Sequence, residues 1–147
     1  GILLYATLHR FGFASAPESR SAHDGLRLLD CRIANAVRCL PPQKKPTPEE
    51  VRTCNAYLKQ EIAALPSLRV ILALGAVAHR AALMALGLAA APHPFAHGAR
   101  HALPGGRALL DSYHCSRYNT QTRRLTAESF AAVFAAIRNE LARAAKP

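Results

Sequence analysis

Apolar and polar residues succeed one another in the second half of the chain as they do in parallel α/β sheets. Residues 70–74 form a continuous apolar run that stops at Gly75, which is typical of a strand covered on both faces. The next residues predict a helix over 76–86, ended by Gly87. A further strand is predicted at 107–113.

Helices are also predicted at both ends of the chain and in its middle. Residues 2–11 predict a helix closed by Gly12. Thr47 is the expected N-cap of a middle helix, because Pro48 follows it and Glu50 completes a capping box. The apolar stripe of this helix is Val51, Cys54, Leu58 and Ile62. A last helix follows Thr126, and its apolar side chains are Phe130, Val133, Phe134, Ile137 and Leu141.

The remaining segments are predicted to be loops around one more strand. Residues 14–25, 41–46 and 89–106 are rich in Pro, Gly and polar residues, which indicates loops. Residues 31–37 fit a short strand. The pattern therefore predicts an α/β sandwich with three strands, folded as a single domain over residues 1–147.

By this interpretation, the chain begins inside its first predicted helix. Nothing before Ile2 can cap the first helix, and Gly1 stands where an initiator Met is expected. We therefore expect an upstream piece of the domain to be absent, and a processed or engineered start is the alternative.

The charge is positive and unevenly distributed. Lys and Arg outnumber Asp and Glu by 19 to 9. Residues 66–127 hold seven basic residues and a single acidic one, Asp111. A surplus of this size favours a polyanionic partner, with nucleic acid first. The alternative is a basic protein without such a partner.

The sequence predicts a cytoplasmic protein. It contains neither an apolar run of membrane-spanning length nor the pattern of a signal peptide. The four cysteines would then lie in a reducing compartment, where burial or metal binding is expected more often than disulfides.

Residues 112–124 carry the strongest chemical signal. They place His114 at a strand end, followed by Arg117, Arg123 and Arg124 and by hydroxyl and amide side chains that can donate to phosphates or base edges. The alternative is a solvated loop in which His114 merely caps the sheet.

Asn35 is a second candidate, because Asn is disfavoured within a strand unless its amide has partners. A carboxamide offers a donor and an acceptor side by side, which matches the edge of uracil. The alternative is an Asn bonded to neighbouring backbone. Ligands of parallel sheets bind beyond the carboxyl ends of the strands, so Asn35, Gly75 and His114 are expected along one edge.

Cysteine and histidine spacing gives weaker indications of metal binding. The loop before Thr47 could bring Cys39 and Cys54 to one metal, although two thiolates do not complete a site and two buried thiols are the alternative. His93, His97 and His101 recur every four residues, but Pro94 and Gly98 argue against a helix that would align them. We interpret these three histidines as loop residues, with His97 near the mouth of the site at most.

Five short motifs follow one another over nearly the whole chain. They are residues 35–42, residues 45–50 with Cys54, residues 72–75, residues 95–98, and residues 112–114 with 119–122 and 124–126. In this order they resemble the family 5 uracil-DNA glycosylases. The resemblance implies a three-layer α/β/α sandwich around a short parallel sheet, whose first strand would be absent from this chain.

The resemblance also implies a 4Fe-4S cluster on four cysteines. Cys39 and Cys54 match the second pair of ligands, and the first pair would lie upstream of this chain. The motif that positions the attacking water in the family would lie upstream as well.

Site roles follow from the same resemblance. Asn35 matches the residue that contacts the base, and His114 matches the catalytic residue that hydrogen-bonds the base as it leaves. The predicted DNA-binding residues are Ser116, Arg117, Asn119, Thr120, Gln121, Thr122, Arg123 and Arg124. Cys115 and Arg123 depart from the family, which usually has an apolar residue and Gly at these positions.

We therefore expect a monomeric DNA-repair enzyme that hydrolyses the N-glycosidic bond of uracil and other deaminated bases. Its partner would be double-stranded DNA, with the target base flipped out of the helix. The alternatives are a non-catalytic DNA-binding fragment or degenerate relative without the water-positioning motif, and a small-molecule hydrolase.

Overall fold

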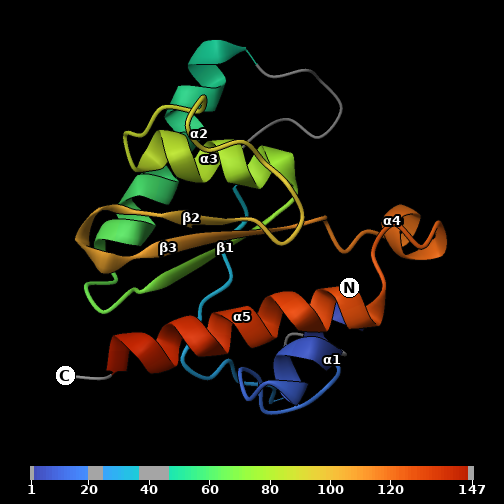
Figure 1. Ribbon diagram of the computed structural model, residues 1–147. Helices are drawn as coiled ribbons and strands as arrows, with labels where there is room; N and C mark the ends of the chain where they lie inside the picture. Colours follow the sequence, from blue (N-terminus) through green and yellow to red (C-terminus); the bar gives the residue numbers. More distant parts are fainter. Residues whose placement is uncertain (1, 20–24, 37–46, 146–147) are drawn as a thin grey trace.

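In the part of the chain that the structure describes, the sheet has three strands in the order β1-β3-β2 (Figure 1). The computed structural model describes residues 2–19, 25–36 and 47–145. The elements are α1 (Ile2–Arg10), α2 (Pro48–Ala63), β1 (Val70–Leu74), α3 (Ala76–Ala85), β2 (Arg100–Ala102), a 3-10 turn η1 (Pro104–Gly106), β3 (Ala108–Ser112), α4 (Arg117–Gln121) and α5 (Ala127–Ala145).

Helices cover both faces of this sheet. Figure 1 shows α2 and α3 on one face and α5 with α1 on the other. β1 and β3 are parallel, with Leu74 opposite Ser112 at their carboxyl ends. The three-layer α/β arrangement is therefore confirmed, and both strands lie where the apolar runs predicted them.

Alternate residues of β3 serve the two layers, as the pleat of a strand requires. Ala108 and Leu110 pack in the core formed with α5, whereas Leu109 packs in the core formed with α3. The α5 face buries Phe130 completely and Phe134 almost so. A fully buried aromatic side chain contributes about 1.5–3 kcal/mol to folding, so α5 is a major source of stability for the sheet.

The N-terminal end of α2 follows the capping rules. Thr47 accepts the Glu50 N–H at 3.1 Å, and the Glu50 carboxylate accepts the Thr47 N–H at 3.0 Å. The predicted capping box is confirmed. Asn55, buried on α2, donates to the carbonyl of Ala81 at 2.8 Å and so joins α2 to α3.

Three sequence predictions of local structure are wrong. Residues 31–36 form no strand, because their backbone does not join the ladder of the sheet, and Val37 lies outside the described residues. The predicted loop at 89–106 contains β2 and η1. Residues 117–121, to which the sequence pattern assigned no helix, form α4, whose N-cap is Ser116.

Within the described ranges of the chain, no helix combines the length and the apolar character that crossing a membrane requires.

Candidate active site

The carboxyl ends of β1 and β3 meet at Gly75 and His114. The Gly75 N–H donates to the carbonyl of Ser112 at 2.8 Å, which ties the turn after β1 to the end of β3. Gly75 has φ +96°, and a Cβ at this position would lie 3.3 Å from the Cβ of His114. Glycine is therefore required both by the backbone conformation and by the close approach of the His114 side chain. His114 itself is exposed.

Side chains of the loop after His114 form hydrogen bonds with the backbone of the same loop. Asn119 donates through Nδ2 to the carbonyl of His114 at 2.9 Å, and the Ser116 hydroxyl accepts the Asn119 N–H at 3.2 Å. The hydroxyls of Thr120 and Thr122 donate to carbonyls of α4. Four of the predicted DNA-binding residues thus shape the loop around His114.

The three arginines of the loop face outward. Arg117, Arg123 and Arg124 are all exposed. The Arg124 guanidinium also lies over the ring of Tyr113, 4.5 Å from its centroid. Arg123 has φ +61°, the left-handed region that favours glycine. The loop therefore presents three positive charges beside His114, one of them on a strained residue.

His97 fixes the backbone next to His114. Its Nδ1 accepts the Tyr113 N–H at 3.0 Å, and its Nε2–H donates to the carbonyl of Ser129 at 3.2 Å. The two bonds select the neutral ring with its hydrogen at Nε2. The imidazole also stacks on Tyr113, with centroids 4.9 Å apart. His97 thus links the end of β3 to the start of α5. It lies closer to His114 than the interpretation as a loop residue near the mouth of the site predicted.

Within residues 66–127, the described surface around this strand end carries no exposed carboxylate. Asp111, the single acidic residue among residues 66–127, is fully buried. Arg100 is paired with Glu140 on α5, and the hydrogen bond from Arg100 holds the pKa of Glu140 below its usual value. The exposed arginines of the loop therefore face solvent, and no exposed carboxylate from residues 66–127 neutralises them. This arrangement favours binding of a polyanion.

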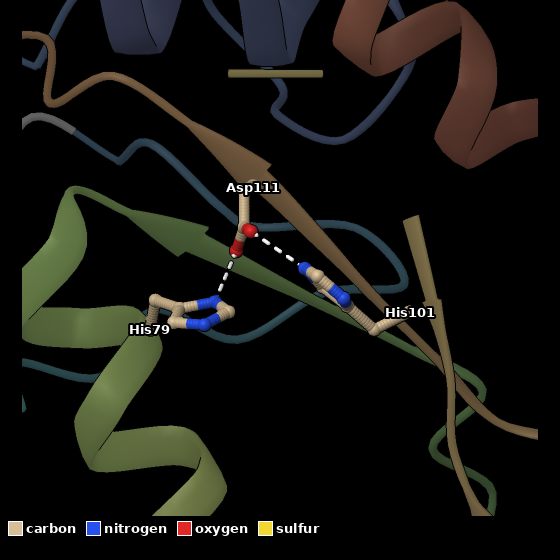
Figure 2. Close-up of side chains that lie close together, drawn as sticks. All are labelled: His79, His101 and Asp111. Atoms are coloured by element: carbon tan, nitrogen blue, oxygen red, sulfur yellow. Dashed lines mark hydrogen bonds and ion pairs between the residues drawn. The ribbon is translucent and has the colours of Figure 1, made fainter. Parts of the chain in front are cut away.

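A buried cluster that the sequence did not reveal lies behind this edge. His79 on α3, His101 on β2 and Asp111 on β3 converge on one point (Figure 2). The Asp111 carboxylate lies 2.7 Å from Nδ1 of His79 and 2.8 Å from Nε2 of His101. The interpretation of His101 as a loop residue is wrong, since it lies on a strand with its side chain buried. A carboxylate inside an apolar strand was the signal that could have indicated this cluster.

Asn35 lies outside the sheet. It is exposed, in the irregular segment that leads toward α2. A hollow of about 290 Å³ lies between the loop at Gly98, β3 and α5, and neither Asn35 nor His114 lines it. This hollow is therefore not a cavity shared by Asn35 and His114.

The cysteines fall into two groups. Cys54 is buried on α2, with its sulfur 3.6 Å from the carbonyl of Ala36, three residues before Cys39. Cys39 itself lies outside the described residues. Cys31 and Cys115 pack instead against the core beside α5, and burial raises the pKa of both thiols. Cys54 is bonded in a disulfide in this structure, so it would serve as one of the four thiolates of a cluster only in its reduced form.

Sequence comparison assigns the family. The model of the uracil DNA glycosylase superfamily matches residues 1–138. The Type-5 uracil-DNA glycosylase of Thermus thermophilus is 52% identical over 130 residues, which are 88% of this chain and 59% of that protein. The Type-5 enzyme of Mycobacterium tuberculosis is 44% identical over 86% of this chain and 48% of its own length. That of Pyrobaculum aerophilum is 39% identical over 88% of this chain and 56% of its own length.

The chain thus spans about half the length of the curated relatives it matches. The matched residues include Gly75, His114 and the α4 loop, which form the strand-end arrangement described above. The chain belongs to the uracil-DNA glycosylase superfamily.

Proposed function

We propose that this protein removes uracil from DNA by hydrolysing the N-glycosidic bond. The observation that carries the proposal is the superfamily match over residues 1–138, which includes a strand end where His114 stands beside a loop of exposed arginines. Water adds to the sugar carbon, and the base leaves with the electrons of the broken bond.

His114 is the proposed catalytic residue. Negative charge develops on the base as the bond breaks, and a preorganised donor stabilises it more in the transition state than in the substrate. The bond from Asn119 to the His114 carbonyl and the contact with Gly75 support a fixed position for the imidazole. Asn35 is the proposed partner of the uracil edge, through its paired donor and acceptor.

Duplex DNA is the proposed partner, bound by a monomer of this protein. The target nucleotide must leave the base stack, at a cost of a few kcal/mol that is lowest at a mismatch. Contacts from Arg117, Arg123 and Arg124 to phosphates would offset this cost. Other deaminated bases, hypoxanthine and xanthine, are proposed as further substrates.

A 4Fe-4S cluster is the proposed structural cofactor. Cys39 and Cys54 would supply two of its four thiolates, and the cluster would cross-link the segment before α2 to α2 itself. Support comes from the burial of Cys54 and from its approach to Ala36.

Uracil release from a U:G duplex tests the proposed function. The full-length protein is expected to leave an abasic site that alkali cleaves, whereas a T:A duplex of the same sequence stays intact. DNA binding without release from any lesion would instead identify a non-catalytic relative. Absence of both binding and release would favour a small-molecule hydrolase.

A further inference from the structure

We propose that His79, His101 and Asp111 form a binding site for a divalent transition metal of the zinc class, separate from the cysteines and from the strand-end site. One ligand atom from each residue lies within 4.8 Å of the other two. The three residues come from α3, β2 and β3, so a bound ion would cross-link a helix to two strands (Figure 2).

The donor set is chemically suited to such an ion. Two imidazole nitrogens and a carboxylate are ligands that Zn²⁺ binds in proteins, at about 2.0–2.2 Å. Burial of the three residues is nearly complete, with exposed fractions of 2% for His79, 9% for His101 and 0% for Asp111. The buried Asp111 carboxylate is hydrogen-bonded to both imidazoles, and an ion between these groups would take over that compensation of its charge.

The hydrogen positions around His79 support metal binding through its Nδ1. Nε2 of His79 lies 2.6 Å from the carbonyl of His93, and a carbonyl only accepts, so Nε2 carries a hydrogen. The ring is thereby oriented with Nδ1 toward Asp111. A metal-bound imidazole commonly donates its other N–H to a backbone carbonyl in the same way.

The two contacts with Asp111 each need a shared hydrogen when no metal is bound. Without one, a bare imidazole nitrogen would face a carboxylate oxygen at 2.7 Å for His79 and 2.8 Å for His101. A divalent cation replaces both shared hydrogens. Each imidazole then coordinates as the neutral ring, with its hydrogen on the far nitrogen, Nε2 of His79 and Nδ1 of His101.

Coordination requires the two contacts with Asp111 to lengthen and the two imidazole nitrogens, which lie within 4.8 Å of each other, to reach tetrahedral spacing. Ligand atoms around a tetrahedral zinc lie about 3.3 Å apart, so the two contacts lengthen by roughly half an ångström. The His93 ring adjoins the cluster without belonging to its three ligand residues. Its ring meets that of His101 edge-on with centroids 5.7 Å apart, and its Nδ1 hydrogen is engaged by the carbonyl of Ala89 at 2.9 Å. The lone pair of His93 is therefore at Nε2.

Cobalt titration of the chain with Cys39→Ser and Cys54→Ser tests the site without competition from those thiols. One equivalent of Co²⁺ is expected to bind and to give visible d–d absorption, with no thiolate-to-cobalt charge-transfer band. Zn²⁺ is expected to displace the cobalt and to raise the Tm, because an ion that binds only the folded state stabilises it. No saturable binding by a folded protein would overturn the proposal.

Substitutions assign the ligands. Asp111→Asn and His101→Asn are each expected to weaken Co²⁺ binding at least tenfold, whereas His9→Asn, at an exposed position of α1, leaves it unchanged. Circular dichroism checks folding of each variant. If the variants unfold, X-ray absorption of the zinc-loaded Cys39→Ser, Cys54→Ser chain decides. A nitrogen and oxygen shell with scattering from at least two imidazoles supports the site, and any other shell overturns it.

Discussion

The carbonyl of His114 accepts a hydrogen bond from the Asn119 side chain, while its Cβ abuts Gly75. These two contacts act on one residue from two directions, so its position depends on both the α4 loop and the turn after β1. His97 acts one residue earlier, by accepting the Tyr113 N–H. Individual side chains around this strand end therefore hold the backbone that carries the His114 imidazole.

Arg123→Gly separates backbone strain from charge at the residue scale. A left-handed backbone costs a non-glycine residue about 1–2 kcal/mol, part of which the greater entropy of unfolded glycine cancels. We expect the variant to be more stable by up to about 1 kcal/mol in urea unfolding. If Arg123 contacts a phosphate, the salt slope of DNA binding falls by about 0.9.

Arg123→Lys is the matched control, because it keeps both the charge and the unfavourable backbone conformation. It is expected to keep the salt slope and the stability of the unmodified chain. Equal DNA-binding slopes for the Gly and Lys variants would remove Arg123 from the DNA contact surface.

Cys31 and Cys115 are expected to react slowly with iodoacetamide. Burial is the main cause of the raised pKa of each thiol, so the reactive thiolate is scarcer at pH 8 than in free cysteine. Mass spectrometry of the modified peptides, with glutathione as the reference, measures the rates. Both thiols should match the reference once urea unfolds the chain, and a fast reaction in the folded protein would contradict their burial.

At the scale of elements, the strand β1, the Gly75 turn and α3 form one unit. The Gly75 carbonyl accepts the His79 N–H at 3.0 Å, so the residue that starts α3 also abuts His114. β3 forms the second unit. It directs Asp111 toward α3 and ends at the strand-end site, so the buried cluster and the surface site share one strand.

Gly75→Ala tests the first of these units. Its φ of +96° with ψ of 162° lies in a region that is essentially restricted to glycine, where other residues incur about 1–3 kcal/mol of strain. We expect a loss of stability of that size and slower uracil excision, because the new methyl group presses on His114. Urea unfolding and single-turnover excision measure the two effects.

Gly87→Ala is the control for that substitution. Gly87 also has positive φ, but nothing lies within 4 Å of an added Cβ. It is expected to lose stability and to keep its excision rate. A normal rate in Gly75→Ala would show that the contact with His114 has no part in catalysis.

Elements with a clear local signal could be predicted from sequence, and β2 and α4, which lack one, could not. The α2 capping box and the apolar run of β1 are local signals that tertiary structure did not override. β2 has three residues and α4 has five, too few for a periodic pattern. Residues 31–36 have strand-like composition, but a strand also needs a hydrogen-bonding neighbour, which composition does not encode.

The candidate sites divide in the same way. His114 and its arginines are close in sequence, so one loop revealed them. In the buried cluster, His101 and His79 lie 10 and 32 positions before Asp111 in the sequence. Only the packing of α3 and β2 on β3 brings the three residues together.

At the scale of the whole molecule, the positive charge and the fold favour the same partner. The described surface of residues 66–127 carries exposed arginines on α3 and in the α4 loop, whereas the one carboxylate of that stretch is buried. The proposed DNA contact lies where the carboxyl ends of β1 and β3 meet, the usual ligand position of open α/β sheets.

DNA affinity is expected to fall steeply with salt. Three phosphate contacts, by Arg117, Arg123 and Arg124, predict a slope of about −2.7 in a plot of log K against log salt for duplex DNA. Arg117→Ala should reduce the magnitude of the slope by about 0.9, whereas Arg52→Ala, at an exposed position of α2, should not change it. A slope near zero would exclude the loop as a phosphate-binding surface.

The most direct test of the account is single-turnover excision by His114→Ala on a U:G duplex, with DNA affinity measured in parallel. Loss of one preorganised donor predicts an excision rate at least ~100-fold lower than that of the unmodified protein, with an unchanged Kd for DNA. A rate close to that of the unmodified protein would contradict the assignment of His114 as the residue that stabilises the departing base.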